Sequence, residues 1–437
     1  MTVPHRPYFW IEPGGAKSPA GWQPLSDHNY WEARSRAPQW QSFLGSAPSW
    51  ADDLHRVGRA VFAADKHSRR DASFDRWTRH MRLSIPVAAY ERWQSVRPLL
   101  ASLLRTMTAD RWDVEFREAD LATNVPFTFD PDSRAGEVAL FSGGLDSLSW
   151  AGQRASVRTS EELLLVSFGE QNFGHLQDSV YDGIYQRRAR PVRRIILSQN
   201  VRIQDKDQGD PDPERTTRSR GFLYATAAVR AAAAEGAPFA HIPENGQLSI
   251  NPPLTPARAA ACSTRSVHPW TLHLLNRLIG AVAGGPVVRL QNPLANLTKR
   301  QVCHSALDAG LTPADLADTL SCGTPPKQHP HSSGLANCGL CYPCLVRRAG
   351  LLGMDQTPYD SDPWDPRLSW DQAEHWHALL SWLDASYSLR DLIADTPLPP
   401  GADSQATLAV IKRGREELSE LREIEGQDLM LAPIRTA

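Results

Sequence analysis

The hydrophobic pattern of the central part of the chain alternates between short apolar runs and longer segments with helical spacing. The apolar runs, which are typical of buried strands, lie at 137–141, 163–168, 194–198 and 239–243. Helical spacing begins near Leu145 and recurs at 175–190 and 216–235. Strands that alternate with helices of about 10–20 residues predict an α/β fold, in which helices cover both faces of a parallel sheet.

The pattern continues with two further predicted helices, at 269–282 and 298–309, and a short predicted strand at 287–290. These elements complete a predicted core domain at 133–352. Beyond the core, residues 353–437 predict a C-terminal helical region with a Pro-rich break at 396–401.

The first 132 residues differ from the core because they hold eight of the fourteen tryptophans. Tryptophan fills cores and domain interfaces more often than it contacts a ligand. This stretch contains a predicted strand at 81–87 and a predicted helix at 89–104, and a Pro/Asp-rich linker at 129–133 ends it. We therefore expect an α+β accessory domain at 1–132.

The composition limits the classes of function. The chain has 47 Lys plus Arg and 49 Asp plus Glu, which gives a formal charge of −2. A protein that coats nucleic acid is usually strongly basic, so direct nucleic-acid binding is not expected. No window approaches the about 18 consecutive apolar residues of a membrane helix, and the N-terminus lacks the apolar region of a signal peptide. We expect a cytoplasmic protein with no membrane partner.

The loop that follows the first predicted core strand reads SGGLDS. The helix that begins there offers unpaired N–H groups and the positive end of its dipole, both of which favour phosphate. Glycine lets the backbone approach phosphate oxygens, serine offers hydroxyl groups, and Asp146 can hold a metal ion such as Mg²⁺. The loop has no lysine and is not a Walker A loop. The predicted nucleotide-binding residues are Ser142, Gly143, Gly144, Leu145, Asp146 and Ser147.

This loop matches the SGGxDS signature of the PP-loop ATP pyrophosphatases, which cleave ATP to AMP and pyrophosphate while they adenylate a substrate. The alternative is a Ser/Gly/Asp turn that only begins a helix, which is common after strands.

A second motif comprises four of the six cysteines: Cys322, Cys338, Cys341 and Cys344. The last three are spaced CxxCxxC, so their thiolates can face one ion while the first arrives from an upstream loop. In a reducing compartment such a cluster is more typical of a metal site than of disulfides. Four thiolates leave no open coordination position, which predicts a structural Zn²⁺. An iron–sulfur cluster and free thiols are the alternatives.

Together and in this order, the two motifs resemble the 7-cyano-7-deazaguanine synthase (QueC) family. The resemblance covers about residues 137–350. Three further segments look like family motifs: 167–176 with Gln171 and His175, 217–223 with Arg220, and 293–299 with Lys299. The resemblance implies a Rossmann-like PP-loop core with one zinc knuckle. It also implies an enzyme that uses ATP and Mg²⁺ to adenylate the carboxylate of 7-carboxy-7-deazaguanine, after which an amine attacks.

The chain also departs from the family. The family's substrate loop is absent, and 243–246 and 251–254 stand in its place. The regions 1–132 and 353–437 have no counterpart in housekeeping enzymes and resemble larger QueC-like proteins of bacterial anti-phage operons, such as the Qat and CBASS systems. That resemblance implies a deazaguanine–protein ligase whose amine belongs to a partner protein of the same operon. The alternatives are the ammonia-using synthase and an inactive nucleotide-binding scaffold.

Polar residues after the fourth predicted strand are candidates for the substrate site, because ligands of open α/β sheets bind at the carboxyl edge. Glu244 and Asn245 could contact the hydrogen-bonding face of a guanine-like base, or could form only a turn. Lys299 could neutralise phosphate charge in the transition state, or could be a solvated residue at a helix start. The candidate catalytic residues are Asp146, Ser147 and Lys299.

Overall fold

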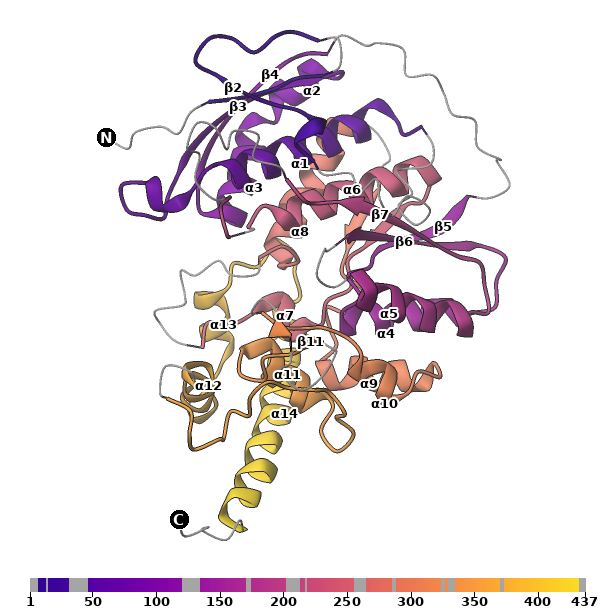
Figure 1. Cartoon of the computed structure of the whole chain (residues 1–437), viewed down its shortest axis with the longest axis vertical. Helices are drawn as coiled ribbons and strands as arrows, with labels where there is room; N and C mark the ends of the chain where they lie inside the picture. Colours follow the sequence, from indigo (N-terminus) through magenta and orange to yellow (C-terminus); the bar gives the residue numbers. More distant parts are fainter. Residues whose placement is uncertain are drawn as a thin grey trace.

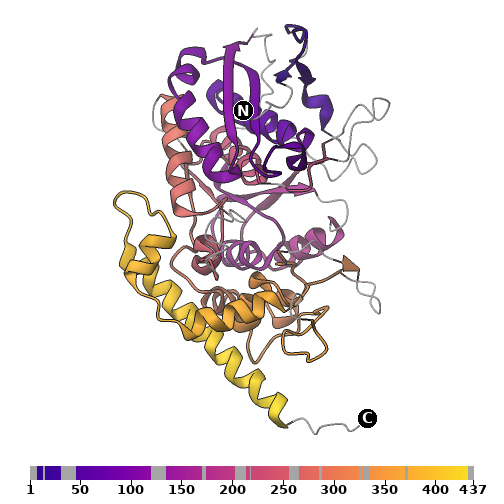
Figure 2. The same cartoon turned by 90° about the vertical axis from the view of Figure 1, so that its left-hand side faces the viewer.

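The computed structural model describes residues 7–12, 15–30, 46–119, 134–169, 174–201, 213–216, 218–254, 265–284, 288–323, 327–328, 335–369 and 373–431. Within these residues the fold is α/β, with two sheets whose strands are all parallel (Figure 1). Layers of helices separate and flank the two sheets, and the C-terminal helices lie at the opposite end from the N-terminal sheet (Figure 2).

The larger sheet has five strands in the order β7-β6-β5-β8-β9. The strands are β5 (Ala135–Leu140), β6 (Glu162–Gly169), β7 (Val192–Ser198), β8 (Phe239–His241) and β9 (Arg289–Gln291). Each was predicted from an apolar run, and β6 is buried along almost its whole length, as a strand covered on both faces should be. The chain winds one way from β5 to β7 and the other way from β5 to β9. Ligands of such sheets bind at this switch, beyond the carboxyl ends of β5 and β8.

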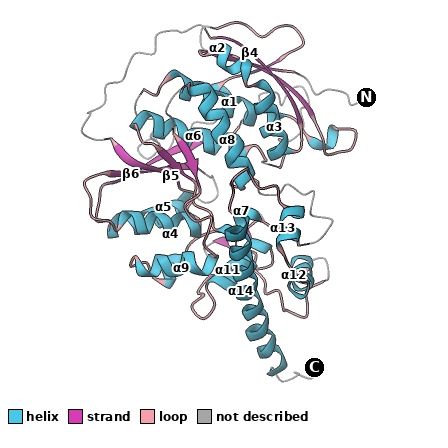
Figure 3. Ribbon diagram, turned by 180° about the vertical axis from the view of Figure 1, so that it is seen from behind, coloured by secondary structure: helices cyan, strands magenta, loops and turns pink. Residues whose placement is uncertain are grey.

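Helices cover both faces of this sheet, as the sequence predicts (Figure 3). One hydrophobic core joins the sheet to α4 (Leu145–Ala155), α5 (Gly174–Arg187), α9 (Lys299–Asp308) and α10 (Pro313–Ala317). The other face packs on α6 (Arg220–Glu235) and α8 (Pro269–Ala283). No described helix is both long enough and apolar enough to span a membrane.

The N-terminal sheet has four strands in the order β2-β1-β3-β4. They are β1 (Tyr8–Trp10), β2 (Gln23–Leu25), β3 (His80–Val87) and β4 (Arg111–Glu118), and η1 (Asp27–Asn29) follows β2. The α+β expectation for this region is wrong in its sheet, because every neighbouring pair of strands is parallel. Parallel strands need helical crossovers, and α1 (Ser49–His67) supplies one that the sequence analysis did not predict.

The helix expected at 89–104 is two helices, α2 (Tyr90–Ser95) and α3 (Arg97–Thr108). Pro98 lies in the first turn of α3, where its missing N–H costs nothing, and this explains the new start. The expected linker at 129–133 lies outside the described residues.

The N-terminal region shares one hydrophobic core with α6 and α8. Helix α1 packs on α6 at close range because Gly58 faces Thr226, whose Oγ1 would lie 2.2 Å from a Cβ at position 58. Buried alanines along α6 allow the same close approach.

The C-terminal region is helical, as predicted, and its Pro-rich break separates α13 (Leu389–Asp395) from α14 (Ser404–Leu431). The other helices of this half of the molecule are α7 (Gly246–Ile250), α11 (Tyr342–Gly350) and α12 (Glu374–Asp384), and a ribbon of β10 (Lys327–Gln328) and β11 (Leu335–Ala336) precedes α11. Helix α14 packs on α7 and α11, and its far end projects from the body of the molecule (Figure 1).

Candidate functional site

The Ser142–Ser147 loop joins β5 to α4, as the sequence predicts. Gly143 has a φ of +76°, a left-handed conformation that L side chains rarely adopt, and a Cβ there would lie 3.2 Å from the Gln177 Cα. The Gln177 side chain also donates a hydrogen bond of 2.9 Å to the Ser142 carbonyl. Gly143 is therefore required by the shape of the loop itself, apart from any ligand.

The N-terminus of α4 lies at this loop, and its N-cap residue, Gly144, has no side chain to cap the helix. The Leu145 N–H donates to the Ser321 hydroxyl at 3.2 Å, so a residue next to Cys322 closes one side of the helix start. The Ser147 hydroxyl donates to the Gly144 carbonyl at 2.9 Å and lies 3.2 Å from the Ser142 hydroxyl. The loop presents the hydroxyls and the helix start together, which is the arrangement expected for an anion site.

Asp146 is the centre of the candidate site. Its Oδ2 lies 2.6 Å from the Lys299 ammonium and accepts a hydrogen bond of 3.1 Å from the Asn245 amide. These partners come from the start of α9 and from the segment after β8, so three distant segments meet at the switch between β5 and β8. Lys299 is fully buried, which rules out the alternative that it is a solvated helix-start residue.

The electrostatics of this cluster are unusual. Burial raises the pKa of Asp146, but the Lys299 charge and the Glu244 and Asn245 side chains outweigh it and hold the pKa below its usual value. Burial and the charge of Asp146 raise the pKa of Glu244 well above its usual value. The second oxygen of Asp146, Oδ1, is buried and receives no hydrogen bond from an N–H or hydroxyl group of the described residues, while the protonated Glu244 carboxyl is hydrogen-bonded to the Asp146 carboxylate. A buried carboxylate oxygen without a partner suits a cation or a ligand donor.

The Asn245 side chain makes its hydrogen bonds within the protein. Its Oδ1 accepts from the Leu248 N–H at 3.1 Å and caps α7, while its Nδ2 donates to Asp146. The side chain is fully buried and engaged within the protein. The geometry therefore favours a positioning role for Asn245 over contact with a base.

The C-terminal helix α14 supports the same site, which the sequence did not indicate. The Lys299 N–H donates to Gln247 Oε1 at 2.9 Å, and Gln247 fills the space left by Gly414 of α14. The Thr298 hydroxyl, the N-cap of α9, donates to Glu417 of α14. Thus α14 holds both α7 and the start of α9, and with them Lys299.

The four predicted cysteines come together. Their sulfur atoms all lie within 4.8 Å of one another, and three of the pairs are 3.4–3.9 Å apart. A tetrahedral ion with metal–sulfur bonds of about 2.3 Å requires sulfur pairs about 3.8 Å apart. Backbone N–H groups of Gly323, Cys338 and Cys341 donate to the sulfurs, which stabilises thiolates. The cluster can bind a metal such as zinc.

The remaining predicted residues are not part of the Asp146 cluster. His175, at the start of α5, lines a cavity of about 560 Å³ with residues of α4, α5 and α10. Arg220 begins α6 and lies over the Tyr224 ring at 5.8 Å. Gln171 lies outside the described residues. Three residues that support the site were not predicted: Gln177, Gln247 and Glu417. Gln177 and Gln247 lie close in the sequence to predicted residues, which is the only signal that could have indicated them. The sequence gives no signal for Glu417.

No protein-family model matches the chain, and a search of curated proteins finds no match.

Proposed function

We propose that this protein is an ATP-dependent enzyme of the QueC-like PP-loop type, which adenylates a carboxylate and releases pyrophosphate. The observation that carries the proposal is the Asp146 cluster. A buried aspartate, one oxygen of which receives no hydrogen bond from an N–H or hydroxyl group of the described residues, and a buried lysine at 2.6 Å lie beside a glycine loop and a helix start. The carboxyl edge between β5 and β8 is where such sheets bind nucleotides.

Each group has a part in the reaction. The substrate carboxylate oxygen forms a bond to the α-phosphorus of ATP, and the bond from that phosphorus to the bridging oxygen breaks, which releases pyrophosphate. The loop N–H groups and the hydroxyls of Ser142 and Ser147 would hold the phosphates. Asp146, through Oδ1, would hold Mg²⁺, whose charge offsets that of the leaving pyrophosphate. Lys299 adds a buried positive charge that needs no reorganisation as negative charge develops.

For the substrate we propose the carboxylate of 7-carboxy-7-deazaguanine, on the resemblance stated above. An amine then attacks the acyl-adenylate, loses a proton and displaces AMP. Glu244 is the candidate that faces the base. Because its pKa is raised, Glu244 would be protonated, and the base would compete with Asp146 for the one hydrogen bond that this carboxyl can donate.

The experiment follows ATP labelled in the α and γ phosphates, with and without 7-carboxy-7-deazaguanine. We expect AMP and pyrophosphate that depend on the deazaguanine and are lost in Asp146→Asn. Asp365→Asn is the matched control, since Asp365 pairs only with the exposed Arg367 in the described chain. Release of ADP would reject α–β cleavage, and binding of ATP without any turnover would favour the scaffold alternative.

For the amine we propose a partner protein of the same operon. An α-amino group, with a pKa of about 7.7–8.0, is more often unprotonated at neutral pH than a lysine side chain. Intact-mass analysis of operon neighbours, incubated with the enzyme, ATP and the deazaguanine, should show the added acyl group. Unmodified neighbours together with free 7-cyano-7-deazaguanine from ammonia would assign the protein to the housekeeping reaction.

For the cysteine cluster we propose one structural zinc. Four thiolates satisfy a tetrahedral ion and leave no site for water, so the metal would stabilise the segment from Ser321 to α11 rather than take part in chemistry. Metal analysis of the purified protein should give one zinc per chain. Iron, or a folded protein with no metal, would contradict the proposal.

A further inference from the structure

A second cavity, of about 440 Å³, lies where the N-terminal region meets the segment before α6. Two chain segments far apart in sequence line it: residues 69–71 with 76–77, and residues 213–216. The first segment includes η3 (Arg70–Ala72). Four arginines, Arg69, Arg70, Arg76 and Arg215, line the cavity together with the ring of Trp77.

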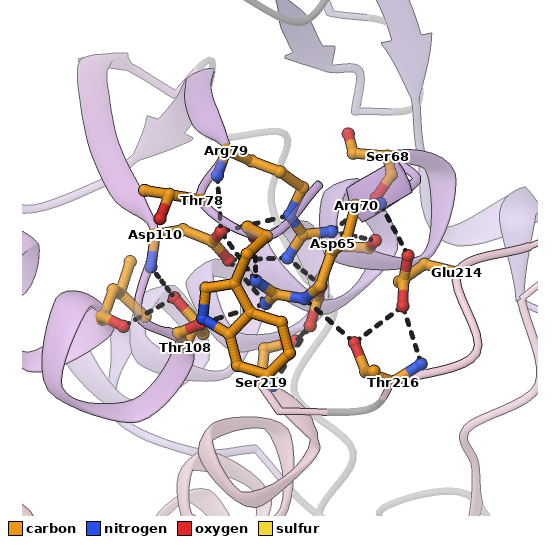
Figure 4. Close-up of polar contacts among 12 residues, drawn as sticks. Asp65, Ser68, Arg70, Thr78, Arg79, Thr108, Asp110, Glu214, Thr216 and Ser219 are labelled. Carbon is orange, nitrogen blue, oxygen red and sulfur yellow. Dashed lines mark hydrogen bonds and ion pairs between the residues drawn. The ribbon is translucent and has the colours of Figure 1, made fainter. Parts of the chain in front are cut away.

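Buried polar contacts hold the two segments together (Figure 4). The Glu214 carboxylate accepts hydrogen bonds of 2.8 Å from the Arg70 N–H and from the Thr216 N–H. The Arg70 guanidinium donates to Thr216 Oγ1 at 3.1 Å, to the Trp77 carbonyl at 2.7 Å and to Asp110. These contacts fix the floor of the cavity before any ligand arrives.

The net charge at the opening of the cavity is positive. Glu214 is buried and turned toward backbone donors, and the exposed Asp71 pairs with Arg69. Arg76 and Arg215 are exposed, and neither forms an ion pair with any residue in the described part of the chain. A cavity with two exposed guanidiniums free for ion pairing, on a chain of net charge −2, favours an anion.

Trp77 gives the cavity a flat aromatic surface. The residue is 41% exposed, and the Arg218 guanidinium lies 4.2 Å from the centre of its ring. Asp75 Oδ1 accepts from the N–H groups of Trp77 and Thr78 at 2.9 and 2.7 Å, which fixes the turn that presents the ring. An aromatic ring flanked by arginines is the usual platform for a nucleobase.

Arg76 is in a strained conformation. Its φ is +53°, in the left-handed region that glycine prefers. A glycine would form this turn more easily, yet an arginine with an exposed side chain stands here. Such conformations gather at functional sites, although helix ends also use them, as Ala109 does after α3.

We propose that this cavity binds a nucleoside phosphate, with Arg76 and Arg215 on the phosphate and the base on Trp77. The ligand is a free nucleotide or the terminal nucleotide of a single strand, since both present the same base and phosphate. This site is separate from the Ser142–Ser147 loop and goes beyond the proposed adenylation. It would also be a local exception to the absence of nucleic-acid binding that the overall charge predicts.

The test uses two probes, uridine monophosphate and a 5′-phosphorylated pentathymidylate, titrated calorimetrically into the full chain at low salt. Each is measured on the wild type and on the variants Arg76→Gly, Arg215→Ala and Trp77→Ala. Loss of a charge-assisted contact in the two arginine variants, and loss of base stacking in Trp77→Ala, should each weaken binding about tenfold or more. Arg367→Ala is the control, because that side chain is 88% exposed and outside the cavity.

The two sources separate by affinity: a pentathymidylate that binds much more tightly than the monophosphate indicates a strand end, and equal affinity indicates a free nucleotide. Asp146→Asn must leave the affinity unchanged, which separates this site from the proposed ATP site. Glycine adopts the φ of position 76 without strain, so urea denaturation should show that the Arg76→Gly variant is folded and about as stable as the wild type. No binding of either probe by the wild type, or equal binding by the wild type and all three variants, would overturn the proposal.

Discussion

Two of the buried clusters of charged side chains that the structure describes lie in opposite halves of the molecule. In the N-terminal half, Arg70 and Arg79 share the Asp110 carboxylate, and Arg79 also pairs with Asp65 (Figure 4). Every side-chain nitrogen and oxygen of these four residues has a hydrogen-bond partner, including the Ser219 N–H on Asp65 at 3.1 Å. This cluster is complete without a ligand.

The second cluster, at the carboxyl edge of the five-stranded sheet, is incomplete. Asp146 and Lys299 form an ion pair, but no N–H or hydroxyl group of the described residues donates to Asp146 Oδ1, and the hydrogen-bonded Glu244 has a pKa raised well above its usual value. A carboxylate that the protein leaves half-satisfied is a candidate for binding, whereas a fully satisfied one is a candidate for stability. The hydrogen-bond inventory, more than burial or charge, distinguishes the two clusters.

The sharpest test of this distinction is Asp110→Asn. The substitution leaves the buried guanidiniums of Arg70 and Arg79 with Asp65, which pairs with Arg79, and the neighbouring Glu214 to offset them in the described part of the chain. Removal of one partner from a buried ion pair costs about 3–5 kcal/mol, and we expect a loss of that size in the free energy of unfolding. Urea denaturation of the apo protein measures it.

The matched control is Asp113→Asn, which removes a carboxylate that also faces two arginines, Arg82 and Arg97, but at the surface. Exposed ion pairs contribute about 0–1 kcal/mol, so this variant should unfold almost as the wild type does. If Asp110→Asn and Asp113→Asn lost the same free energy of unfolding, the completeness of a hydrogen-bond network would not determine how much that network stabilises the fold.

Asp146→Asn should have the opposite profile, with a large effect on turnover and a small one on stability. Lys299 loses its ion-pair partner, but Glu244 lies beside it, and without the Asp146 charge the pKa of Glu244 is raised by burial alone, which the Lys299 charge opposes. We expect pyrophosphate release to fall at least about 100-fold, equal to about 2.7 kcal/mol in the barrier, and the free energy of unfolding to change by less than about 1 kcal/mol. A stability loss as large as that of Asp110→Asn would make Asp146 a structural residue.

The sequence predicted the incomplete cluster better than the complete one. The loop with Asp146 is a local motif, and Glu244 and Lys299 follow or begin predicted elements at one edge of a parallel sheet, so topology alone places them together. The cysteines were equally predictable, because three of them lie within seven residues of one turn and helix start. Local spacing and sheet topology are the information that a single sequence contains.

The complete cluster was invisible in the sequence because its members come from separate elements without a motif. Asp65 lies in the last turn of α1, Arg79 precedes β3, and Asp110 precedes β4. The parallel N-terminal sheet was missed for a related reason: β1 and β2 are three residues each, too short for a periodic pattern. The support from α14 depends on tertiary packing of Gly414 and Glu417, which no local pattern reports.

That support can be tested by filling the space beside α14. In Gly414→Ala the new Cβ would lie 2.1 Å from Gln247 Nε2. The Gln247 side chain must then shift, which disturbs the hydrogen bond that its Oε1 accepts from the Lys299 N–H. Overpacking of this kind costs about 1–3 kcal/mol, and we expect a loss of stability in that range with a several-fold loss of turnover.

Gly280→Ala is the control for the previous variant, because Gly280 is also inside a helix but a Cβ there meets nothing within 4 Å. Its helix should be stabilised by up to about 1 kcal/mol, with unchanged turnover. If Gly414→Ala left both stability and turnover unchanged, α14 would be a bystander and the incomplete cluster would be supported by the sheet alone.

The smallest expected effect is the pH dependence that separates the clusters. Glu244 keeps its proton in the folded state at pH values where the unfolded chain, with an ordinary glutamate pKa of about 4.5, has released it. The contribution of Glu244 to the free energy of unfolding is therefore full below pH 4.5. It is lost as pH rises toward the pKa of the folded state, and the free energy of unfolding falls by at most about 1.4 kcal/mol per pH unit. Asp65 behaves in the opposite way: Arg79 outweighs burial and holds its pKa low, so its contribution is lost as pH falls.

Glu244→Gln isolates the first effect, because glutamine cannot titrate. Measured by urea denaturation from about pH 5 upward, the stability of the wild type should fall relative to that of Glu244→Gln as pH rises. In the Asp146→Asn background the same comparison should give a shallower slope, because the charge of Asp146 and its hydrogen bond with Glu244 both raise the pKa of Glu244 in addition to burial. Equal slopes in both backgrounds would show that burial alone sets this pKa. Glu244 and Asp146 would then be independent groups, and the incomplete cluster would reduce to the Asp146–Lys299 pair.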